Sequence, residues 1–556
     1  MKQPSRPLPW RLGLSASVFI VPERPLFETL STGIDGLDSI LGGGIRYPKD
    51  TAAFVFLTGH AGTGKTLLGL EILTRAWWSD SEDGRTFLFY SVEQSPADLY
   101  KKLVQDFGNF FGAPQPVHII DDSHPRKLCL ETTGPKGENN RLVITQANPA
   151  TGDGNGFDIN IEWIQAEIGN YGRAAPVGMV CIDNVGLLLN DLEHDDRRGA
   201  LLRTRTDLMR KGVHGIFIHE ESSQLTSRFP SAEELSTDVL IQLSFQDSGH
   251  SFRERTIEIV KARHQYYYRG KHHFSIAGKG RQEVILGARG ERGPGAHLYS
   301  SVPAQLSIAR DENCMVMPPR GEEPISFGQE PLDQAFHGNW GPTHLSSSIL
   351  LAEPGTHYTS FALRFLAKGI EAGDAGICIS TKEDPDAIHR ICWRLDSLKA
   401  LRDENGEETR ALKKDFKLLY LHPEFITAGK FVSDIVRATE QVNRSTNGQL
   451  RLAFDNVSQL GRRFPLLADQ DFLIPAMLDI LRYKSVTPLF IDIVPPGTAM
   501  HDPHYSPAAH LALFDNVFHL YLKEEEMDGK MQSRTQMRIL KSVANNFDCS
   551  PFPLNF

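Results

Sequence analysis

Short apolar runs alternate with longer amphipathic stretches along most of this chain. The first run, residues 52–57, reads Ala-Ala-Phe-Val-Phe-Leu, and residues 67–73 after it space leucine and isoleucine as a helix does. Further apolar runs of strand length lie at residues 86–92, 177–182 and 215–219. Buried strands separated by helix-length segments are typical of a mainly parallel sheet with helices on both faces. The pattern therefore predicts an α/β fold.

The same succession of segments occurs twice. Residues 31–38 read STGIDGLD and residues 326–333 read SFGQEPLD. After each motif come an apolar run with a loop (54–66 and 349–359), a strand with a polar end (91–96 and 380–385), a strand ending in Asp-Asn (180–185 and 452–457) and a closing strand (255–263 and 534–543). Self-similarity of this kind indicates two tandem copies of one fold.

These repeats set the expected domain boundaries. We expect an N-terminal tail at residues 1–25, a first domain at 26–300, a linker at 301–322 and a second domain at 323–556. The first domain contains a segment at about 130–160 that we expect to be an insertion. This segment is polar and rich in Gly and Asn, so it is expected to be an inserted surface loop.

One glycine-rich octapeptide follows the first apolar run and precedes the predicted helix. Its residues are Gly59, His60, Ala61, Gly62, Thr63, Gly64, Lys65 and Thr66. In this setting glycines let the backbone fold closely around phosphate oxygens, and the helix N-terminus supplies N–H groups and partial positive charge. Lys65 is expected to reach the outer phosphates, and Thr66 to ligate Mg²⁺. The octapeptide therefore predicts a P-loop that binds a nucleoside triphosphate.

Acidic residues end two of the other apolar runs. Asp183 follows residues 177–182, and Glu220 and Glu221 follow residues 215–219. The carboxyl ends of parallel strands meet at one edge of a sheet, so Asp183 is expected beside the P-loop, where it can hold Mg²⁺ directly or through water. A strand-ending aspartate is common, and this assignment depends on the P-loop upstream. Glu220 and Glu221 are further candidates for sensing the γ-phosphate.

The chain resembles the KaiC-like branch of the RecA-fold ATPases. The resemblance rests on the motif at residues 30–38, on Gly42, Gly43 and Gly44, on the strand that ends in Glu93 and on the tandem duplication. It covers nearly the whole chain from about residue 26 and is weaker in the second copy. It implies two RecA-like domains, ATP and Mg²⁺ as ligands, hydrolysis of the triphosphate and assembly into a ring, hexameric by analogy.

Three residues of the first copy correspond to catalytic elements of that family. Glu93 resembles the carboxylate that orients or deprotonates the attacking water, although relatives often carry two acids where this chain has Glu93 and Gln94. Lys261 and Arg263 resemble a lysine-x-arginine element that reaches the nucleotide of the neighbouring subunit. The alternatives are a solvated turn acid for Glu93 and a solvated basic strand end for Lys261 and Arg263.

The loop of the second copy departs from this chemistry. Aligned with the octapeptide, it reads Ala352, Glu353, Pro354, Gly355, Thr356, His357, Tyr358 and Thr359. Tyr358 stands at the lysine position and His357 at the position of the last glycine. Glu353 places a negative charge near the expected phosphates, which is electrostatically adverse.

Other positions of the second copy change as well. Lys382 replaces Glu93, and the closing element reads Lys541-Ser542-Val543, while Asp455 retains the strand-ending aspartate. We expect the second copy not to hydrolyse nucleotide and to act as a scaffold, a regulator or a platform for partners. The same losses argue against autokinase activity.

Composition limits the remaining choices. The chain has 59 basic and 69 acidic residues, a formal charge of −10, so no overall field attracts nucleic acid. Its six cysteines form no C-x-x-C pair, which favours a reducing compartment without structural zinc. The apolar stretch at 12–21 imitates a secretory signal, but neighbouring prolines and the missing cleavage site argue against export. No apolar run approaches the roughly 20 residues of a membrane span, so we expect a cytoplasmic protein.

The sequence therefore favours an oligomeric ATP-hydrolysing switch of regulatory, signalling or defence type. Its turnover is expected to be slow, and its partners to be copies of itself and an unidentified protein. Two alternatives stay open. One is a RecA-type nucleic-acid motor or recombinase, and the other is an assembly scaffold that nucleotide stabilises without turnover.

Overall fold

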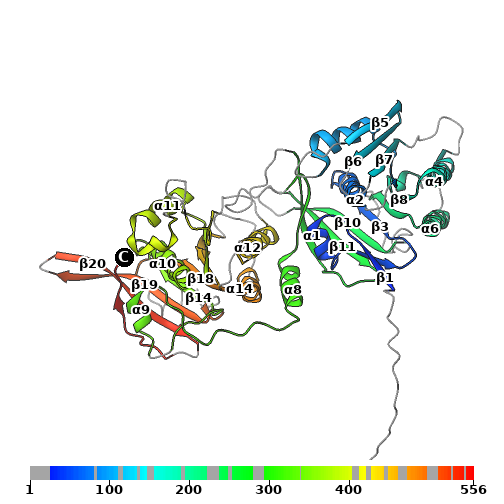
Figure 1. Cartoon of the computed structure of the whole chain (residues 1–556). Coiled ribbons are helices and arrows are strands. Elements are labelled where there is room, and N and C mark those ends of the chain that lie inside the picture. The colour runs from blue at the N-terminus through cyan, green and yellow to red at the C-terminus, as the bar shows by residue number, and fades with distance from the viewer. Residues whose placement is uncertain are drawn as a thin grey trace, which may run out of the picture.

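Two large β-sheets flanked by helices, together with a two-stranded ribbon, make up the computed structural model of the chain (Figure 1). It describes residues 26–80, 84–110, 117–133, 138–146, 156–188, 194–221, 237–247, 253–279, 293–337, 340–403, 412–420, 427–443, 449–460, 467, 472–497, 511–527, 530–543 and 546–556. The expected tail at 1–25 lies outside the described residues. Strands and helices alternate in both domains, which confirms the predicted α/β class.

The first sheet has the order β13-β12-β11-β10-β3-β9-β8-β4-β7-β6-β5 among the described residues. Its strands are β3 (Phe54–Gly59), β4 (Thr86–Ser91), β5 (Val117–His124), β6 (Lys127–Thr133), β7 (Glu138–Gln146), β8 (Val177–Asp183), β9 (His214–Glu220), β10 (Val239–Asp247), β11 (Arg253–Ala262), β12 (Lys271–Ala277) and β13 (Gly295–Tyr299). The helical elements are α1 (Asp35–Ile40), α2 (Lys65–Ser79), α3 (Pro96–Tyr100), η1 (Lys101–Asp106), η2 (Gly108–Phe110), α4 (Gly156–Ala174), α5 (Val185–Leu188) and α6 (His194–Arg210), and the ribbon is β1 (Phe27–Leu30) with β2 (Ile45–Pro48).

The second sheet has the order β16-β15-β17-β18-β14-β19-β20-β21. Its strands are β14 (Ser348–Ala352), β15 (Ala375–Ser380), β16 (Phe416–Tyr420), β17 (Leu450–Asp455), β18 (Val486–Ile493), β19 (Asn516–Met527), β20 (Lys530–Ser542) and β21 (Phe552–Pro553). The helical elements are α8 (Val302–Glu312), α9 (Glu330–Gln334), α10 (Tyr358–Glu371), α11 (Pro385–Arg394), η3 (Asp396–Leu401), α12 (Ala428–Asn443), η4 (Val457–Gln459) and α14 (Leu473–Tyr483). None of the described helices is both long and apolar enough to cross a membrane.

The two sheets share one topology. Strands β11-β10-β3-β9-β8-β4-β7 of the first domain correspond in order to β20-β19-β14-β18-β17-β15-β16 of the second. In each domain the strand before the loop, β3 or β14, lies between two parallel neighbours. The repeat read from the sequence is therefore a repeat of the fold.

The repeated motif also forms the same hydrogen-bonded turn in each domain. Asp38 accepts from the Ser31 hydroxyl at 2.6 Å and from the Thr32 backbone N–H at 2.9 Å. Asp333 accepts from the Ser326 hydroxyl at 2.5 Å and from the next backbone N–H at 3.2 Å. The aspartate satisfies donors of a tight turn, which explains why both copies carry Ser and Asp seven residues apart.

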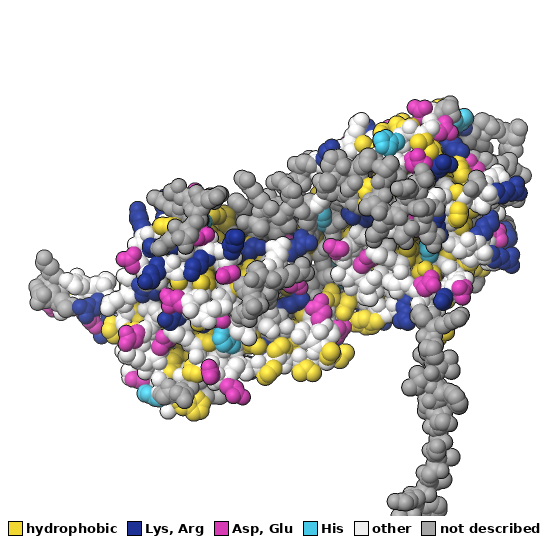
Figure 2. Space-filling view, in the orientation of Figure 1, with side chains coloured by type: hydrophobic (Ala, Val, Ile, Leu, Met, Phe, Trp, Pro, Cys, Tyr) yellow, Lys and Arg dark blue, Asp and Glu magenta, His cyan; other side chains and the backbone are white. Residues whose placement is uncertain are grey.

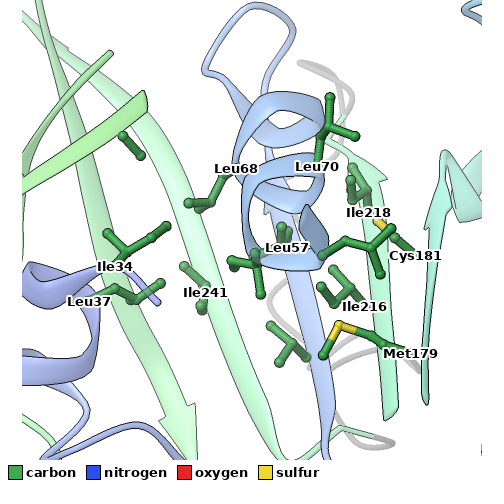
Figure 3. Close-up of a cluster of buried hydrophobic side chains, with 14 of the residues drawn as sticks. Ile34, Leu37, Leu57, Leu68, Leu70, Met179, Cys181, Ile216, Ile218 and Ile241 are labelled. Atoms are coloured by element: carbon green, nitrogen blue, oxygen red, sulfur yellow. The ribbon is translucent and has the colours of Figure 1, made fainter. Parts of the chain in front are cut away.

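The helix after the P-loop covers the centre of the first sheet (Figure 3). Leu68 and Leu70 on α2 are at most 1% exposed and belong to one buried cluster with Leu57 on β3 and Ile216 and Ile218 on β9. Burial of a leucine or isoleucine side chain contributes about 1.5–3 kcal/mol. The apolar runs at 52–57 and 67–73 thus form the strand and helix that the pattern predicted.

Two segments differ from expectation. Part of the expected surface loop at 130–160 is the strand β7, which pairs in parallel with β4 and antiparallel with β6, so the loop prediction is wrong there. Its apolar Leu142, Val143 and Ile144 are at most 1% exposed. The predicted linker at 301–322 contains the helix α8, which packs against α12 and α14 of the second domain. The short apolar run of β7 lies between polar residues, so the hydropathy pattern does not indicate a strand there. The helix α8 is short and amphipathic and was not predicted from the sequence.

A buried carboxylate ties α2 to the connection between the domains. Glu71 is fully buried, accepts from the Ala296 backbone N–H on β13 at 2.7 Å and pairs with Arg75 at 2.7 Å. Desolvation by burial raises the pKa of Glu71 to about 7, although Arg75 lowers it. Strand β13 leads directly into α8, so this contact joins the P-loop helix to the domain junction.

Glu71→Gln is expected to change how stability depends on pH. The folded protein holds a proton on Glu71 up to about pH 7, whereas the unfolded chain releases it near pH 4.5, so the unfolding free energy falls as pH rises between these values. Relative to E71Q, the wild type should lose up to about 3 kcal/mol across this window. Denaturant unfolding at several pH values measures the difference, with the exposed Glu371→Gln as control. A difference independent of pH would contradict the assignment.

Candidate nucleotide-binding site

The P-loop joins β3 to α2 at the carboxyl edge of the first sheet. Gly59 ends β3 with a φ of 146°, and a Cβ there would lie 2.1 Å from the backbone oxygen of Leu243 on β10. Gly64 precedes α2 with a φ of 105°. Thr63 Oγ1 donates to the backbone oxygen of His60 at 2.8 Å and closes the turn. Close approach of β10 and left-handed backbone therefore require glycine at Gly59 and Gly64.

Lys65 begins α2 and points back into the loop. Its side chain is 7% exposed, and its Nζ donates to the backbone oxygen of His60 at 2.8 Å. The same Nζ lies 3.6 Å from Glu220 Oε2 at the end of β9. An ammonium held by a carbonyl and a carboxylate is positioned for an anion that enters the loop.

The two glutamates at the end of β9 lie in different surroundings. Glu220 pairs with the loop lysine, while Glu221 accepts from Thr58 Oγ1 at 2.9 Å and from Gln242 Nε2 at 3.0 Å. From the sequence alone, both residues are candidates for the same role, sensing the γ-phosphate. The pairing of Glu220 with Lys65 was missed, and only the strand register, which sets Glu220 beside Gly59, distinguishes the two.

Thr66 and Asp183 are in contact, as expected if both residues hold the Mg²⁺ of a nucleotide in the P-loop. Thr66 Oγ1 donates to Asp183 Oδ2 at 2.7 Å, although the residues come from α2 and the end of β8. Asp183 is 8% exposed. Burial raises the pKa of Asp183 to about 6, the Thr66 hydrogen bond lowers it, and the nearby charge of Glu93 raises it further. Hydroxyl and carboxylate oxygens are the ligand atoms that Mg²⁺ prefers.

Glu93 lies at the same edge and is exposed. It follows β4, whose last residue Ser91 is in register with Asp183, so the two strand ends are adjacent. Its charge is close enough to act on the Asp183 carboxyl. Its neighbour Gln94 accepts from Lys102 Nζ at 2.6 Å and so turns toward η1. Among these two residues only Glu93 offers a carboxylate for positioning water.

Lys261 and Arg263 lie toward the amino ends of the parallel strands, whereas the P-loop lies at their carboxyl ends. Strand β11 runs antiparallel to β10, and Lys261 pairs with Leu240 near the amino end of β10. Leu240 in turn pairs with Phe56, whereas the P-loop starts at Gly59. Arg263 continues beyond this pairing, its backbone N–H donating to the Asp238 backbone oxygen at 2.9 Å. Within one chain the fold does not bring these cations to the P-loop.

The second domain has the same backbone with other side chains. Thr359 Oγ1 donates to Asp455 Oδ2 at 3.2 Å, as Thr66 does to Asp183. The Thr381 backbone N–H donates to the Asp455 backbone oxygen at 2.6 Å, matching the bond from Val92 in the first domain. This correspondence places Lys382 at the position of Glu93.

The closing element of the second domain also differs. Lys541 Nζ donates to the backbone oxygens of Ala512 and Phe514 at 3.0 and 2.7 Å. Val543 stands where the first domain has Arg263 and is 51% exposed. The lysine is held by its own domain, and the arginine position carries an aliphatic side chain.

A strand, a glycine loop and a helix in this arrangement define a P-loop protein with two tandem RecA-like α/β domains. Residues 30–115 and 134–285 match the family model of the KaiC ATPases. The first domain, which this match covers almost entirely, belongs to the KaiC family. The family match omits residues 116–133, which include β5 and β6 at the outer end of the first sheet.

Similar proteins extend the likeness into the second domain. The circadian clock oscillator protein KaiC of Picosynechococcus is 26% identical over 513 residues, which cover 91% of this chain and 84% of the relative. KaiC 1 of Synechocystis is 25% identical over the same length, covering 91% and 83%. KaiC of Nostoc is 28% identical over 378 residues, covering 66% of this chain and 61% of the relative.

Alanine substitutions at two loop glycines should separate steric clash from backbone strain. Gly59→Ala brings a Cβ against a backbone oxygen of β10, whereas Gly62, with a φ of 77°, has open space around its Cβ position. G62A should lower the unfolding free energy by about 1–2 kcal/mol, the strain of a left-handed residue, and G59A by clearly more, because β10 must move. Equal losses in chemical denaturation would contradict this geometry.

Proposed function

We propose that this chain is an ATP-driven oligomeric switch in which the first domain hydrolyses ATP and the second has a structural role. The observation that carries the proposal is the contact of Thr66 with Asp183 beside the P-loop. A hydroxyl and a buried carboxylate there match the ligands of a nucleotide-bound Mg²⁺. The match of the first domain to the KaiC ATPases supports ATP as the nucleotide.

Each residue of the site has one task in this proposal. Thr66 and Asp183 would hold Mg²⁺, which neutralises charge on the phosphate oxygens when bound. Lys65 leaves the His60 backbone oxygen and binds the outer phosphates. Glu93, the exposed carboxylate at the adjacent strand end, orients the attacking water and accepts its proton.

The remaining positive charge comes from a neighbouring subunit. Lys261 and Arg263 lie at the amino edge of the first sheet, away from the P-loop of their own chain. A head-to-tail ring brings that edge of one subunit to the P-loop of the next, so that its cations stabilise charge in the transition state. Hydrolysis and assembly are then linked, and nucleotide state alters the subunit contacts that a protein partner meets.

The surface favours this switch over a nucleic-acid motor. On the face shown in Figure 2, basic and acidic side chains are interspersed over both domains. The chain as a whole carries a formal charge of −10. A protein that tracks nucleic acid uses a continuous basic band.

Phosphate release and mass photometry test the proposal on the full chain. With ATP and Mg²⁺ the wild type should form rings and release phosphate. Lys65→Ala should abolish release, Glu93→Gln should slow it at least about 100-fold, and Arg263→Ala about 1,000-fold. Asp183→Asn should be inactive, and its counterpart Asp455→Asn should retain wild-type activity.

Three results would contradict parts of the proposal. An active monomer that is indifferent to Arg263→Ala would rule out catalysis in trans. Rings without phosphate release would favour a scaffold. Stimulation of hydrolysis by DNA, with salt-sensitive binding, would favour a motor.

Acidification should weaken Mg²⁺ binding at Thr66 and Asp183 before it unfolds the protein. Mg²⁺ needs the ionised form of Asp183, whose pKa lies at about 6. Below that pH the proton competes with the metal, so the Mg²⁺ concentration for half-maximal phosphate release should rise about tenfold per pH unit. Titrations of Mg²⁺ at steps from about pH 7.5 to 5 measure this, with circular dichroism confirming that the fold persists. A constant Mg²⁺ requirement would contradict the role of Asp183.

A further inference from the structure

The loop of the second domain keeps the shape of a P-loop. Gly355 has a φ of 89° and His357 a φ of 60°, against 77° and 105° at the corresponding glycines of the first domain. Thr356 Oγ1 donates to the Glu353 backbone oxygen at 2.7 Å, as Thr63 does to His60. The helix α10 begins directly after this turn. Whether the loop accepts a nucleotide therefore depends on its side chains.

Tyr358 replaces the lysine and points in another direction. Lys65 turns back to the loop and β9, whereas the Tyr358 hydroxyl accepts from Lys382 Nζ at 3.4 Å, at the end of β15. Tyr358 is 9% exposed. Burial and the nearby Asp455 carboxyl raise the pKa of Tyr358. The phenol thus lies between the residues that correspond to the metal ligand and the water-positioning acid of the first domain.

Asp455 is buried more deeply than the corresponding Asp183. It is 2% exposed, against 8% for Asp183, and its Oδ1 forms no hydrogen bond with a described residue. Its Oδ2 accepts from Thr359 Oγ1 at 3.2 Å. Burial raises the pKa of Asp455 to about 6. A metal ion would therefore have to reach a more deeply buried carboxylate than in the first domain.

Glu353 fixes a negative charge at the base of the loop. The carboxylate is buried and accepts from the backbone N–H groups of Gly497 at 2.8 Å and Leu522 at 3.1 Å. These bonds join the loop to the segments after β18 and within β19, so the charge cannot turn away from an incoming phosphate without breaking them. Phosphate oxygens would meet like charge in a poorly solvated place.

We infer that the second domain fills its own nucleotide site, with Tyr358 and Lys382 in the place of a metal-bound triphosphate. Each chain then binds one nucleotide, in the first domain, and the second domain keeps its form without any. Tyr358 is the residue that excludes the ligand. The inference rests on the proposed function only in assigning the one nucleotide to the first domain.

Nucleotide stoichiometry on the full chain tests this inference. A fluorescent, non-hydrolysable ATP analogue with Mg²⁺ is titrated against wild type and against two variants in each domain. The wild type should bind one analogue per chain. Lys65→Ala and Thr66→Val should reduce binding at least tenfold. Thr359→Val, the counterpart of Thr66→Val, and Asp455→Asn, at the position that corresponds to Asp183, should leave one analogue bound with unchanged affinity.

The outcomes separate this inference from the proposed function. Two analogues per wild-type chain, of which one is lost with T359V, would overturn the filled site. One analogue that persists in K65A but is lost in T359V would also overturn it, and would move the active site to the second domain. No binding by folded wild type would contradict the first-domain site while agreeing with a closed second domain.

Discussion

The alignment of four parallel strands determines which side chains lie beside the first P-loop. Because β3, β9, β8 and β4 are hydrogen-bonded in register, their carboxyl ends finish at one edge of the sheet. This alignment brings Thr66 within 2.7 Å of Asp183 and sets Glu220 beside the loop lysine. The side chains come from segments more than 100 residues apart in the chain, and no local interaction would hold them together.

The second domain shows that the same fold can carry different side chains at the loop. It repeats the strand order, the Ser-Asp turn and the threonine-aspartate contact of the first domain. Yet Tyr358 and Lys382 stand where the first domain has a lysine and a glutamate. A buried parallel sheet tolerates such exchanges at its edge, since its stability comes from the apolar residues between the layers. The fold has therefore been kept while the side chains at the loop have changed within one chain.

The sequence was sufficient for the fold class, the duplication and the P-loop because each leaves a local pattern. Apolar runs of fixed length predict buried strands, and the octapeptide has a fixed spacing. The sequence was insufficient to predict contacts that depend on strand register and on how deeply a side chain is buried. The strand β7 was read as loop because its apolar core of three residues lies among polar neighbours. The different surroundings of Glu220 and Glu221, and the burial of Glu71 against β13, arise only when distant strands pair.

The position of Glu71 gives the first domain a mechanical connection to the second. The helix α2 starts at the P-loop lysine, Lys65, and about two turns later the buried carboxylate of Glu71 accepts from the backbone N–H of Ala296. Six residues beyond Ala296 the chain enters the helix α8, whose Gln305 side chain donates to the Gly429 backbone oxygen on α12 at 2.7 Å. The hydrogen bonds of Glu71 and Gln305 therefore give the P-loop helix a second, non-covalent attachment to the other domain, through β13 and α8, besides the continuity of the chain itself.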